Sequence, residues 1–255
     1  EVINGELDIY IPELKLAIEY NGLYWHSEAN GKGKWYHRNK YEECLKKGIR
    51  LISVMENEWN DSKGLVISKL KHIANASEDR RIAARKCTVV KVSAKEKREF
   101  LDLNHIQGDG TSSINYALTL NGEIVACMAV LNDNNRYQIS RYATSCIVVG
   151  GFTKLLAAFE RDYNYPEIYT FADLRWSRGE LYLKSGFVQT KELPPDYYWV
   201  KGGKAWHKSN WRHTTGLKTL PGYSPEKSEA TIMREHGFSK LWDCGKLQFT
   251  KNIKK

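Results

Sequence analysis

Segments with the two-residue period of strands alternate along this chain with segments that have the 3.6-residue period of helices. Near the start, Leu7, Ile9 and Ile11 alternate with polar residues, which predicts one face of a strand. Pro12 favours a turn after it, because its ring fixes φ. The elements predicted in this part are strands at 6–11, 16–21 and 49–55 and helices at 35–47 and 62–76. This order of strands and helices constrains the chain to a mixed α/β fold.

A charged stretch, residues 77–86, breaks this pattern, and a second α/β pattern follows it. The pair Asn121-Gly122 lies between two apolar runs and is a strong signal for a hairpin. The elements predicted here are strands at 88–92, 114–120, 123–131, 137–142 and 167–172 and helices at 94–104 and 152–161. We therefore expect two domains, at residues 1–78 and 87–255, joined by a linker at residues 79–86.

The chain is basic, with 39 Lys and Arg against 30 Asp and Glu, a formal charge of +9 and a pI near 9.2. Such an excess favours a polyanionic partner, because each neutralised phosphate releases condensed counterions. A solvated basic surface is the alternative. The five cysteines are dispersed, as is typical of reduced thiols in a cytoplasm. No apolar run approaches the roughly 20 residues that span a bilayer, so a membrane partner is not expected.

Two acidic residues are predicted to meet in the first hairpin. Asp8 lies on the first predicted strand, and Glu19 lies on the second between apolar neighbours. An ionised carboxylate inside an apolar strand needs a compensating partner, and a divalent cation is a good one. Two carboxylates completed by water suit Mg²⁺. An acidic residue in a strand more often lies on a solvated edge, but the two together in one hairpin favour a metal site.

Two further residues near this hairpin carry chemistry. Asn21 shares a strand face with Glu19, since side chains repeat every two residues. His26 follows five residues later and can reach the same pocket as a general acid or base. The alternative for the pair Trp25-His26 is ordinary packing.

The segment LDIYIPELKLAIEYNGLYWHSE resembles the core of PD-(D/E)XK nucleases. It is most similar to the branch of very-short-patch-repair endonucleases, which includes phage homing endonucleases of the EDxHD type. The resemblance covers about residues 1–76 and implies that Asp8 and Glu19 bind Mg²⁺, with Mn²⁺ as a substitute. It also implies that His26 is the catalytic histidine. The family often draws a glutamate from a helix before the hairpin, which would precede Glu1 of this chain.

This chain departs from the family pattern at Asn21, where the wider superfamily has a lysine. Lys40 is then a candidate to supply the missing cation, and His37 is a further candidate. The implied mechanism is phosphodiester hydrolysis by a metal-bound water, with His26 moving the proton. His37 or Lys40 would contact the phosphate and stabilise its charge in the transition state.

Two segments of the second domain, SRYATSCIVVGGFTKLLAAFERDY and FADLRWSRGELYLKSGF, resemble an acetyltransferase-like (GNAT) fold. In this resemblance Gly150-Gly151 starts the central helix, and Tyr182 to Phe187 forms the late helix-to-strand signature. The acetyltransferase phosphate loop needs a fuller glycine pattern than Val149 to Phe152 supplies. The backbone amides at this helix N-terminus are candidates to hold an acyl-coenzyme A pyrophosphate or a DNA phosphate.

A tryptophan-rich basic stretch, residues 197–218, is the leading candidate for DNA contacts. Cations suit phosphates, and aromatic faces suit bases or sugars. The alternative is that the tryptophans close a core. The candidate DNA-binding residues are Lys201, Lys204, Trp206, Lys208, Trp211, Arg212 and Lys218. Asp173, Arg175, Ser177 and Arg178 are predicted to form either a polar site at a strand end or a helix cap.

Together these features predict an α/β chain with a PD-(D/E)XK restriction-endonuclease-like core and a GNAT-like targeting domain. The predicted function is Mg²⁺-dependent DNA endonuclease, of a phage homing or free-standing kind, acting on double-stranded DNA in the bacterial cytoplasm. One alternative is a DNA- or nucleotide-modifying transferase that uses the GNAT-like domain. Another is a non-catalytic DNA-binding protein. Nothing in the residues indicates the oligomeric state.

Overall fold

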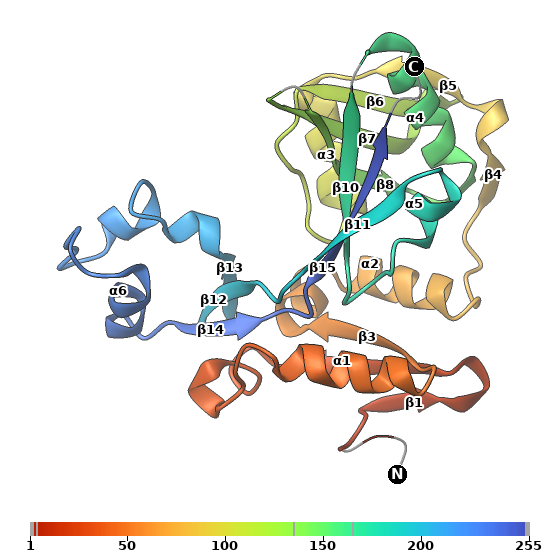
Figure 1. Ribbon diagram of the computed structural model, residues 1–255. Helices are drawn as coiled ribbons and strands as arrows, with labels where there is room; N and C mark the ends of the chain where they lie inside the picture. The colour runs from red at the N-terminus through yellow and green to blue at the C-terminus, as the bar shows by residue number, and fades with distance from the viewer. Residues whose placement is uncertain (1–2, 4, 135, 165, 253–255) are drawn as a thin grey trace. The chain divides into compact units, whose positions relative to one another are not determined.

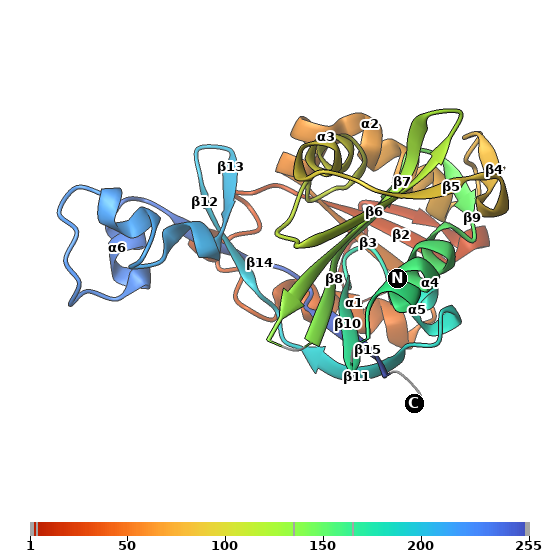
Figure 2. The same ribbon diagram turned by 90° about the horizontal axis from the view of Figure 1, so that it is seen from above.

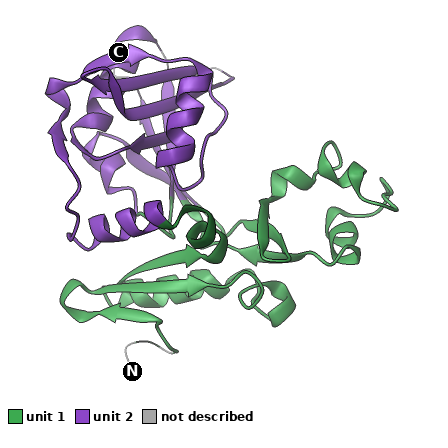
Figure 3. Ribbon diagram, turned by 180° about the vertical axis from the view of Figure 1, so that it is seen from behind, with its two compact units in different colours: residues 1–63, 173–177, 193–246 green, residues 64–172, 178–192, 247–255 purple. Residues whose placement is uncertain are grey.

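A computed structural model describes residues 3, 5–134, 136–164 and 166–252 of the chain. The chain forms two compact units, each built from segments that are distant in sequence (Figure 3). Unit 1 comprises Glu1–Lys63, Asp173–Ser177 and Leu193–Lys246. Unit 2 comprises Gly64–Ala172, Arg178–Glu192 and Leu247–Lys255. None of the described helices is both long and apolar enough to cross a membrane.

Unit 1 begins with a three-stranded sheet in the order β1-β2-β3 (Figure 1). β1 (Ile9–Ile11) pairs antiparallel with β2 (Leu16–Asn21), and β2 pairs in parallel with β3 (Arg50–Met55). The parallel pair requires a crossover connection, and α1 (Tyr36–Lys46) supplies it. β3 is buried at every residue except Arg50.

A second sheet of unit 1 is formed by β13-β12-β14. β12 (Tyr197–Lys201) and β13 (Lys204–His207) form a hairpin through Gly202-Gly203, both of which have positive φ. Two such residues are what a tight hairpin turn needs. β14 (Ser239–Trp242) pairs on the other side of β12, and α6 (Glu229–Glu235) precedes it. Together they enclose a core of Trp199, Leu217, Ile232, Met233 and Phe238.

Unit 2 is built on a seven-stranded sheet in the order β11-β15-β10-β8-β7-β6-β5. Its strands are β5 (Thr88–Lys91), β6 (Ile114–Leu120), β7 (Glu123–Asp133), β8 (Arg136–Thr144), β10 (Glu167–Asp173), β11 (Val188–Leu193) and β15 (Lys246–Asn252). α3 (Ala94–Asn104) and α4 (Gly151–Asp162) lie on opposite faces of this sheet (Figure 2). The short α5 (Glu180–Lys184) precedes β11.

The edge segments of unit 2 hold a smaller parallel pair, β4 (Arg81–Ala83) with β9 (Ile147–Val149). β4 lies within residues 79–86, which the sequence predicted to be a linker. α2 (Glu56–Ile73) is kinked at Ser62, where the predicted helix begins, and its residues from Gly64 onward belong to unit 2. The division into units therefore differs from the predicted boundaries at residues 78 and 87.

The centre of the seven-stranded sheet has two irregular features. The register of β7 on β8 shifts between Ala129 and Val130, so that Ser140 is the extra residue of a bulge on β8. β10 pairs in parallel with β8 at Ile168–Tyr137 and Tyr169–Gln138, and this register extends no further through the described residues of the two strands. Among the residues that the structure describes, β8 and β10 are therefore joined by backbone pairing only near their first residues.

Most predicted elements are confirmed as helices or strands at nearly the predicted residues, and the mixed α/β class is confirmed. The first strand is shorter than the predicted range of 6–11, since β1 does not include Asp8. Ile9, on the predicted apolar face, is 52% exposed. An edge strand with one neighbour has little to pack against, so alternation alone does not show which face is buried.

Candidate nucleic-acid interface

Asp8 and Glu19 do meet in unit 1, but protein groups satisfy both carboxylates. The Asp8 backbone N–H donates to Glu19 Oε1 at 3.1 Å, and the Tyr20 N–H donates to Asp8 Oδ2 at 2.7 Å. The Lys40 ammonium lies 2.5 Å from Glu19 Oε2. Glu19 is buried, as predicted, and its compensating charge is this lysine. The pairing of Lys40 with this site follows the sequence prediction, but its partner is a carboxylate rather than a phosphate.

The prediction that Asp8 and Glu19 hold Mg²⁺ or Mn²⁺ is wrong. In the part of the chain that the structure describes, no three His, Cys, Asp or Glu residues are grouped so that they could hold a metal ion. The physical reason lies in Lys40. Its ammonium neutralises the buried carboxylate that the sequence argument assigned to a divalent cation.

The two predicted histidines stack on each other at the same hairpin. His26 Nδ1 lies 3.3 Å from His37 Nε2, and the ring planes are 19° from parallel. Burial lowers the pKa of His26, and burial together with His26 lowers the pKa of His37 to about 3. Both rings are therefore neutral near pH 7. His37 is buried, so it does not offer a positive charge to a phosphate as predicted.

Asn21 is buried at the end of β2 beside this cluster, and its Nδ2 has no hydrogen-bond partner among the described residues. It lies on the strand that carries Glu19, as the two-residue period predicted. The predicted residues of the hairpin are thus brought together in one place, but as an ion pair and a neutral histidine stack.

The segment from Gly22 to Trp35 exposes large aromatic side chains. Tyr24, Trp25 and Trp35 are 61%, 69% and 50% exposed. The rings of Tyr24 and Trp25 meet edge to face at 5.1 Å. The Lys34 ammonium lies 5.4 Å from the Trp35 ring, and Lys32 also belongs to this segment. We call these five residues the aromatic ledge.

The segment that carries the ledge is held in one conformation. The Tyr24 carbonyl accepts hydrogen bonds from the Ser27 N–H at 3.2 Å, the Ser27 hydroxyl at 2.8 Å and the Asn30 amide at 2.7 Å. The Trp242 indole N–H donates to Glu28 at 2.8 Å. A backbone held in place loses little entropy when a ligand binds, so this segment is suited to binding.

Sequence reasoning missed the ledge. Tyr24 and Trp25 precede the candidate catalytic histidine in the sequence. The alternative given for the pair Trp25-His26 was ordinary packing, so exposure of these rings was not predicted. Periodicity carries no information on exposure in a turn, and the segment from Gly22 to Trp35 contains no strand and no α-helix. The usable signal was three aromatic residues among lysines within this non-repetitive stretch.

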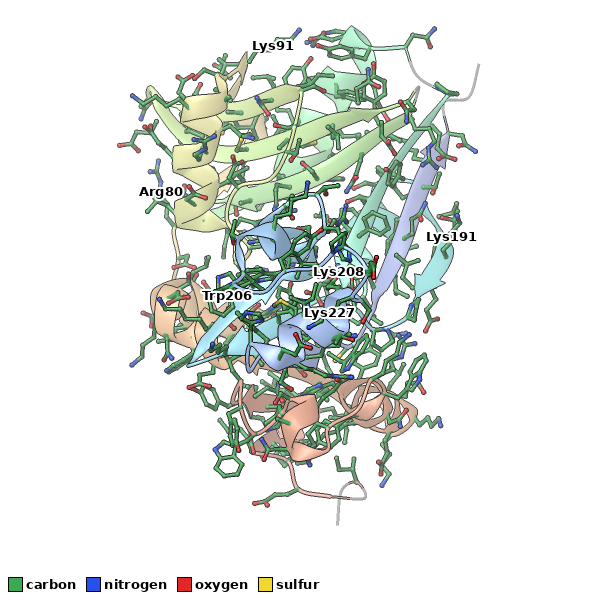
Figure 4. All side chains as sticks on the ribbon, turned by 90° about the vertical axis from the view of Figure 1, so that its left-hand side faces the viewer. Arg80, Lys91, Lys191, Trp206, Lys208 and Lys227 are labelled. Atoms are coloured by element: carbon green, nitrogen blue, oxygen red, sulfur yellow. The ribbon has the colours of Figure 1, made fainter. Side chains whose placement is uncertain are left out.

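The tryptophans of the predicted DNA-binding stretch pack inside unit 1. The Trp206 ring meets Phe238 at 5.5 Å, and Trp211 meets Phe238 at 5.2 Å. Both pack against the core around Trp199. Trp206 is labelled among the side chains of the blue C-terminal segment in Figure 4. The contacts of Trp206 and Trp211 are therefore those of the alternative prediction, in which the tryptophans close a core.

The cations of the same stretch fall into two groups. The Lys208 ammonium lies 2.7 Å from Asp196, and the Lys201 ammonium donates to the His236 carbonyl at 2.7 Å. Lys204, Arg212 and Lys218 are exposed. These three cations are exposed, whereas the tryptophans of the same stretch pack on the core.

Arg175, predicted for a polar site at a strand end, forms a buried ion-pair network in unit 1. Its guanidinium lies 2.9 Å from Glu58 and 2.9 Å from Asp173. Asp243 is also buried here, and burial together with Asp173 raises its pKa to about 6. The Ser53 N–H donates to the Arg175 carbonyl at 3.1 Å. The network connects all three chain segments of unit 1, which is a structural role.

The chain has been compared with known proteins. Neither a protein-family model nor a curated protein matches it. Similar solved structures include a GNAT family acetyltransferase from Elizabethkingia anophelis with acetyl-CoA bound, at 16% identity, a TM-score of 0.36, and coverage of 66% of this chain and 99% of that one. The ribosomal-protein-S18-alanine N-acetyltransferase of Escherichia coli is similar at 11% identity and a TM-score of 0.40, over 66% and 95% of the two chains. A Bacillus subtilis acetyltransferase in complex with CoA matches at 15% and 0.39, over 66% and 100%.

These comparisons contradict the predicted nuclease. The matched structures are acetyltransferases, and none of those reported is a PD-(D/E)XK endonuclease. The predicted homing-endonuclease family, DNA hydrolysis and Mg²⁺ cofactor are therefore wrong. The short motif that carried the resemblance is accounted for by the ion pair and histidine stack described above. Double-stranded DNA as a partner is untested by these findings.

Proposed function

We propose that this chain is a DNA-binding protein and that unit 1 carries the interface. The observation that supports this proposal is the aromatic ledge, where three large rings are exposed on a segment that also carries Lys32 and Lys34, the latter over the Trp35 ring. A contiguous exposed apolar patch usually marks a binding site. Sugars and the base edges in a groove are suitable ligands for such rings.

Charge supports a polyanionic partner. The chain carries a formal +9, and Lys204, Arg212 and Lys218 are exposed on the same unit. Each phosphate that such a cation neutralises adds to the affinity through counterion release. In this proposal the lysines and arginine contact the backbone of double-stranded DNA, and the ledge contacts bases or sugars in a groove.

The test is the anisotropy of a fluorescently labelled DNA duplex titrated with protein at several salt concentrations. We expect Trp25→Ala and Trp35→Ala each to weaken binding by about 5- to 30-fold, which corresponds to the 1–2 kcal/mol that truncation of an interface tryptophan costs. Arg212→Ala and Lys218→Ala should each reduce the salt slope by about one unit. Leu103→Ala is the control, because Leu103 is 77% exposed but lies in unit 2. Ledge variants that bind like this control would refute the proposal.

Acyl transfer is a second candidate function. It is favoured by the strand order of unit 2 and by the short parallel pairing of β8 with β10, since the sequence resembles the acetyltransferase-like fold in this part. That fold implies an acyl-coenzyme A donor, whose diphosphate would lie at the N-terminus of α4. The polar side chains of this helix turn are engaged with the protein, since Lys154 donates to the Ala84 and Cys87 carbonyls and Thr153 donates to the Gly150 carbonyl, so no acyl-transfer step follows from the structure.

A further inference from the structure

The segment that carries the aromatic ledge is bound to β14 within unit 1. The Trp242 indole donates to Glu28, and the Ala29 backbone N–H donates to the Ser239 hydroxyl at 2.9 Å. The Arg234 guanidinium lies 3.6 Å from the same Glu28 carboxylate. The ledge segment is therefore held against the sheet that contains β12 and β14, although Ala29 and Ser239 are 210 residues apart in sequence.

Rings and ammonium groups alternate from the ledge to this sheet. The Lys34 ammonium lies 5.4 Å from the centroid of the Trp35 ring and 5.5 Å from that of the Trp242 ring. The Lys240 ammonium lies 5.4 Å from the Trp242 ring and 4.3 Å from the Tyr197 ring. Lys240 and Trp242 share a face of β14, since side chains repeat every two residues, and Tyr197 pairs with Trp242 across the two strands. We call the series Trp35, Lys34, Trp242, Lys240 and Tyr197 the cation–aromatic row.

The two lysines of the row are half-buried, and among the described residues neither Lys34 nor Lys240 forms an ion pair with a carboxylate. The Glu229 carboxylate instead accepts hydrogen bonds from the Tyr197 hydroxyl at 3.0 Å and from the Trp199 indole at 2.7 Å. An ammonium that lies against a ring keeps its charge. Both lysines are therefore available to phosphates.

The exposed rings of the ledge suit unpaired bases better than paired ones. In a duplex the bases stack on one another, so that they offer only their edges in the grooves. An unpaired base also offers its face, on which an aromatic side chain can stack. Trp25 is 69% exposed and Tyr24 is 61% exposed, so these rings offer faces as well as edges. The alternation of rings with cations likewise suits a single strand, in which bases alternate with phosphates.

We propose that the aromatic ledge and the cation–aromatic row form one path for an unpaired DNA strand, so that unit 1 prefers a duplex with a single-stranded extension to a blunt duplex. This inference rests on the proposed DNA-binding function and adds a substrate class to it. Unpaired bases stack on the rings of the ledge, and Lys34 and Lys240 contact the phosphates of the same strand. These contacts are added to those proposed for the duplex.

The first experiment compares labelled DNAs that carry the same number of phosphates, by fluorescence anisotropy at one salt concentration. One DNA is a blunt duplex, and the other two carry a single-stranded thymidine extension at either end of one strand. We expect an extension to tighten binding at least about 5-fold, which corresponds to one stacked base at about 1 kcal/mol. Equal affinity for all three DNAs would refute the unpaired-strand path and leave the proposed function standing, whereas absence of binding to all of them would refute both.

The second experiment tests the row with Lys34→Met and Lys240→Met, which remove the charge and retain an unbranched side chain. On the extended duplex, each variant should reduce the slope of log affinity against log salt concentration by about 0.7, the value for one phosphate contact on a single strand. The slope on the blunt duplex should be unchanged. Lys191→Met is the matched control, because Lys191 is exposed on β11 of unit 2 (Figure 4). Variants that match this control on the extended duplex, or that lower both slopes equally, would overturn the assignment of the row to an unpaired strand.

Discussion

Replacement of Arg175 by methionine should destabilise the protein severely. The Arg175 side chain is 1% exposed and bridges Glu58 and Asp173 at 2.9 Å each. Methionine fills similar volume but leaves both carboxylates without their cation. Removal of one partner from a buried ion pair costs about 3–5 kcal/mol, because the remaining charge stays desolvated. We expect a loss of about 4 kcal/mol, or roughly 10 °C in Tm for a chain of this size.

The assay is urea unfolding followed by circular dichroism at pH 5 and pH 8. Arg175 lowers the pKa of Asp243, which burial and Asp173 raise to about 6, so its loss raises that pKa further. A carboxyl with a raised pKa in the folded state stabilises less as the pH rises through that value. The deficit of Arg175→Met should therefore be larger at pH 8 than at pH 5.

Arg136→Met is the matched control. Arg136 also bridges two carboxylates, Asp133 at 3.4 Å and Glu167 at 3.3 Å, but its side chain is 46% exposed. Water already solvates such a pair, so the expected cost is about 0–1 kcal/mol. If Arg175→Met costs no more than Arg136→Met, or if its deficit is independent of pH, the reasoning from burial is refuted.

Three further predictions concern stability in urea. Burial lowers the pKa of His37 to about 3, so the protein should lose stability as the pH falls from 6.5 toward 3, and His37→Gln should flatten this dependence; parallel pH profiles would contradict it. Asp243→Asn should stabilise the protein above pH 6, with the gain vanishing near pH 4, and a gain at both pH values would argue against titration. Gly179→Ala should cost about 2–4 kcal/mol, because its φ is +82° and the new Cβ would lie 2.2 Å from the Phe249 ring. Gly48→Ala, with φ of +71° and open space, should cost about 1 kcal/mol, and equal losses would exclude the steric effect.

Local patterns predicted the elements well, and the reasons are physical. Asn121 has φ of 54° and Gly122 has φ of 85°, so the predicted turn pair does form the β6–β7 hairpin. α3 begins at Ser93 with the reciprocal bonds of a capping box to Glu96. Such signals act between residues a few positions apart, and they survive in any tertiary context.

The site was predicted less well, because its chemistry depends on partners distant in sequence. The sequence placed Glu19 in an apolar strand, but it did not show that Lys40, 21 residues later, neutralises it. Likewise the position of Arg175 between a strand and a helix was visible, whereas its partner Glu58 lies 117 residues earlier. A motif predicts which groups lie close together. The charges that neutralise those groups come from the rest of the fold, so the motif does not predict them.

The insertion of residues 193–246 between β11 and β15 has a consequence for the synthesis of the protein. The hydrogen bond between Glu28 and Trp242 can form only after Trp242 has been synthesised, 214 residues after Glu28. At the usual rate of translation this interval is roughly 10–40 s. During that time the first sheet is attached to the ribosome without the C-terminal strands that complete its unit. We expect nascent chains to bind a chaperone over this interval, and release of a chain that ends near residue 192 to leave both units unfinished.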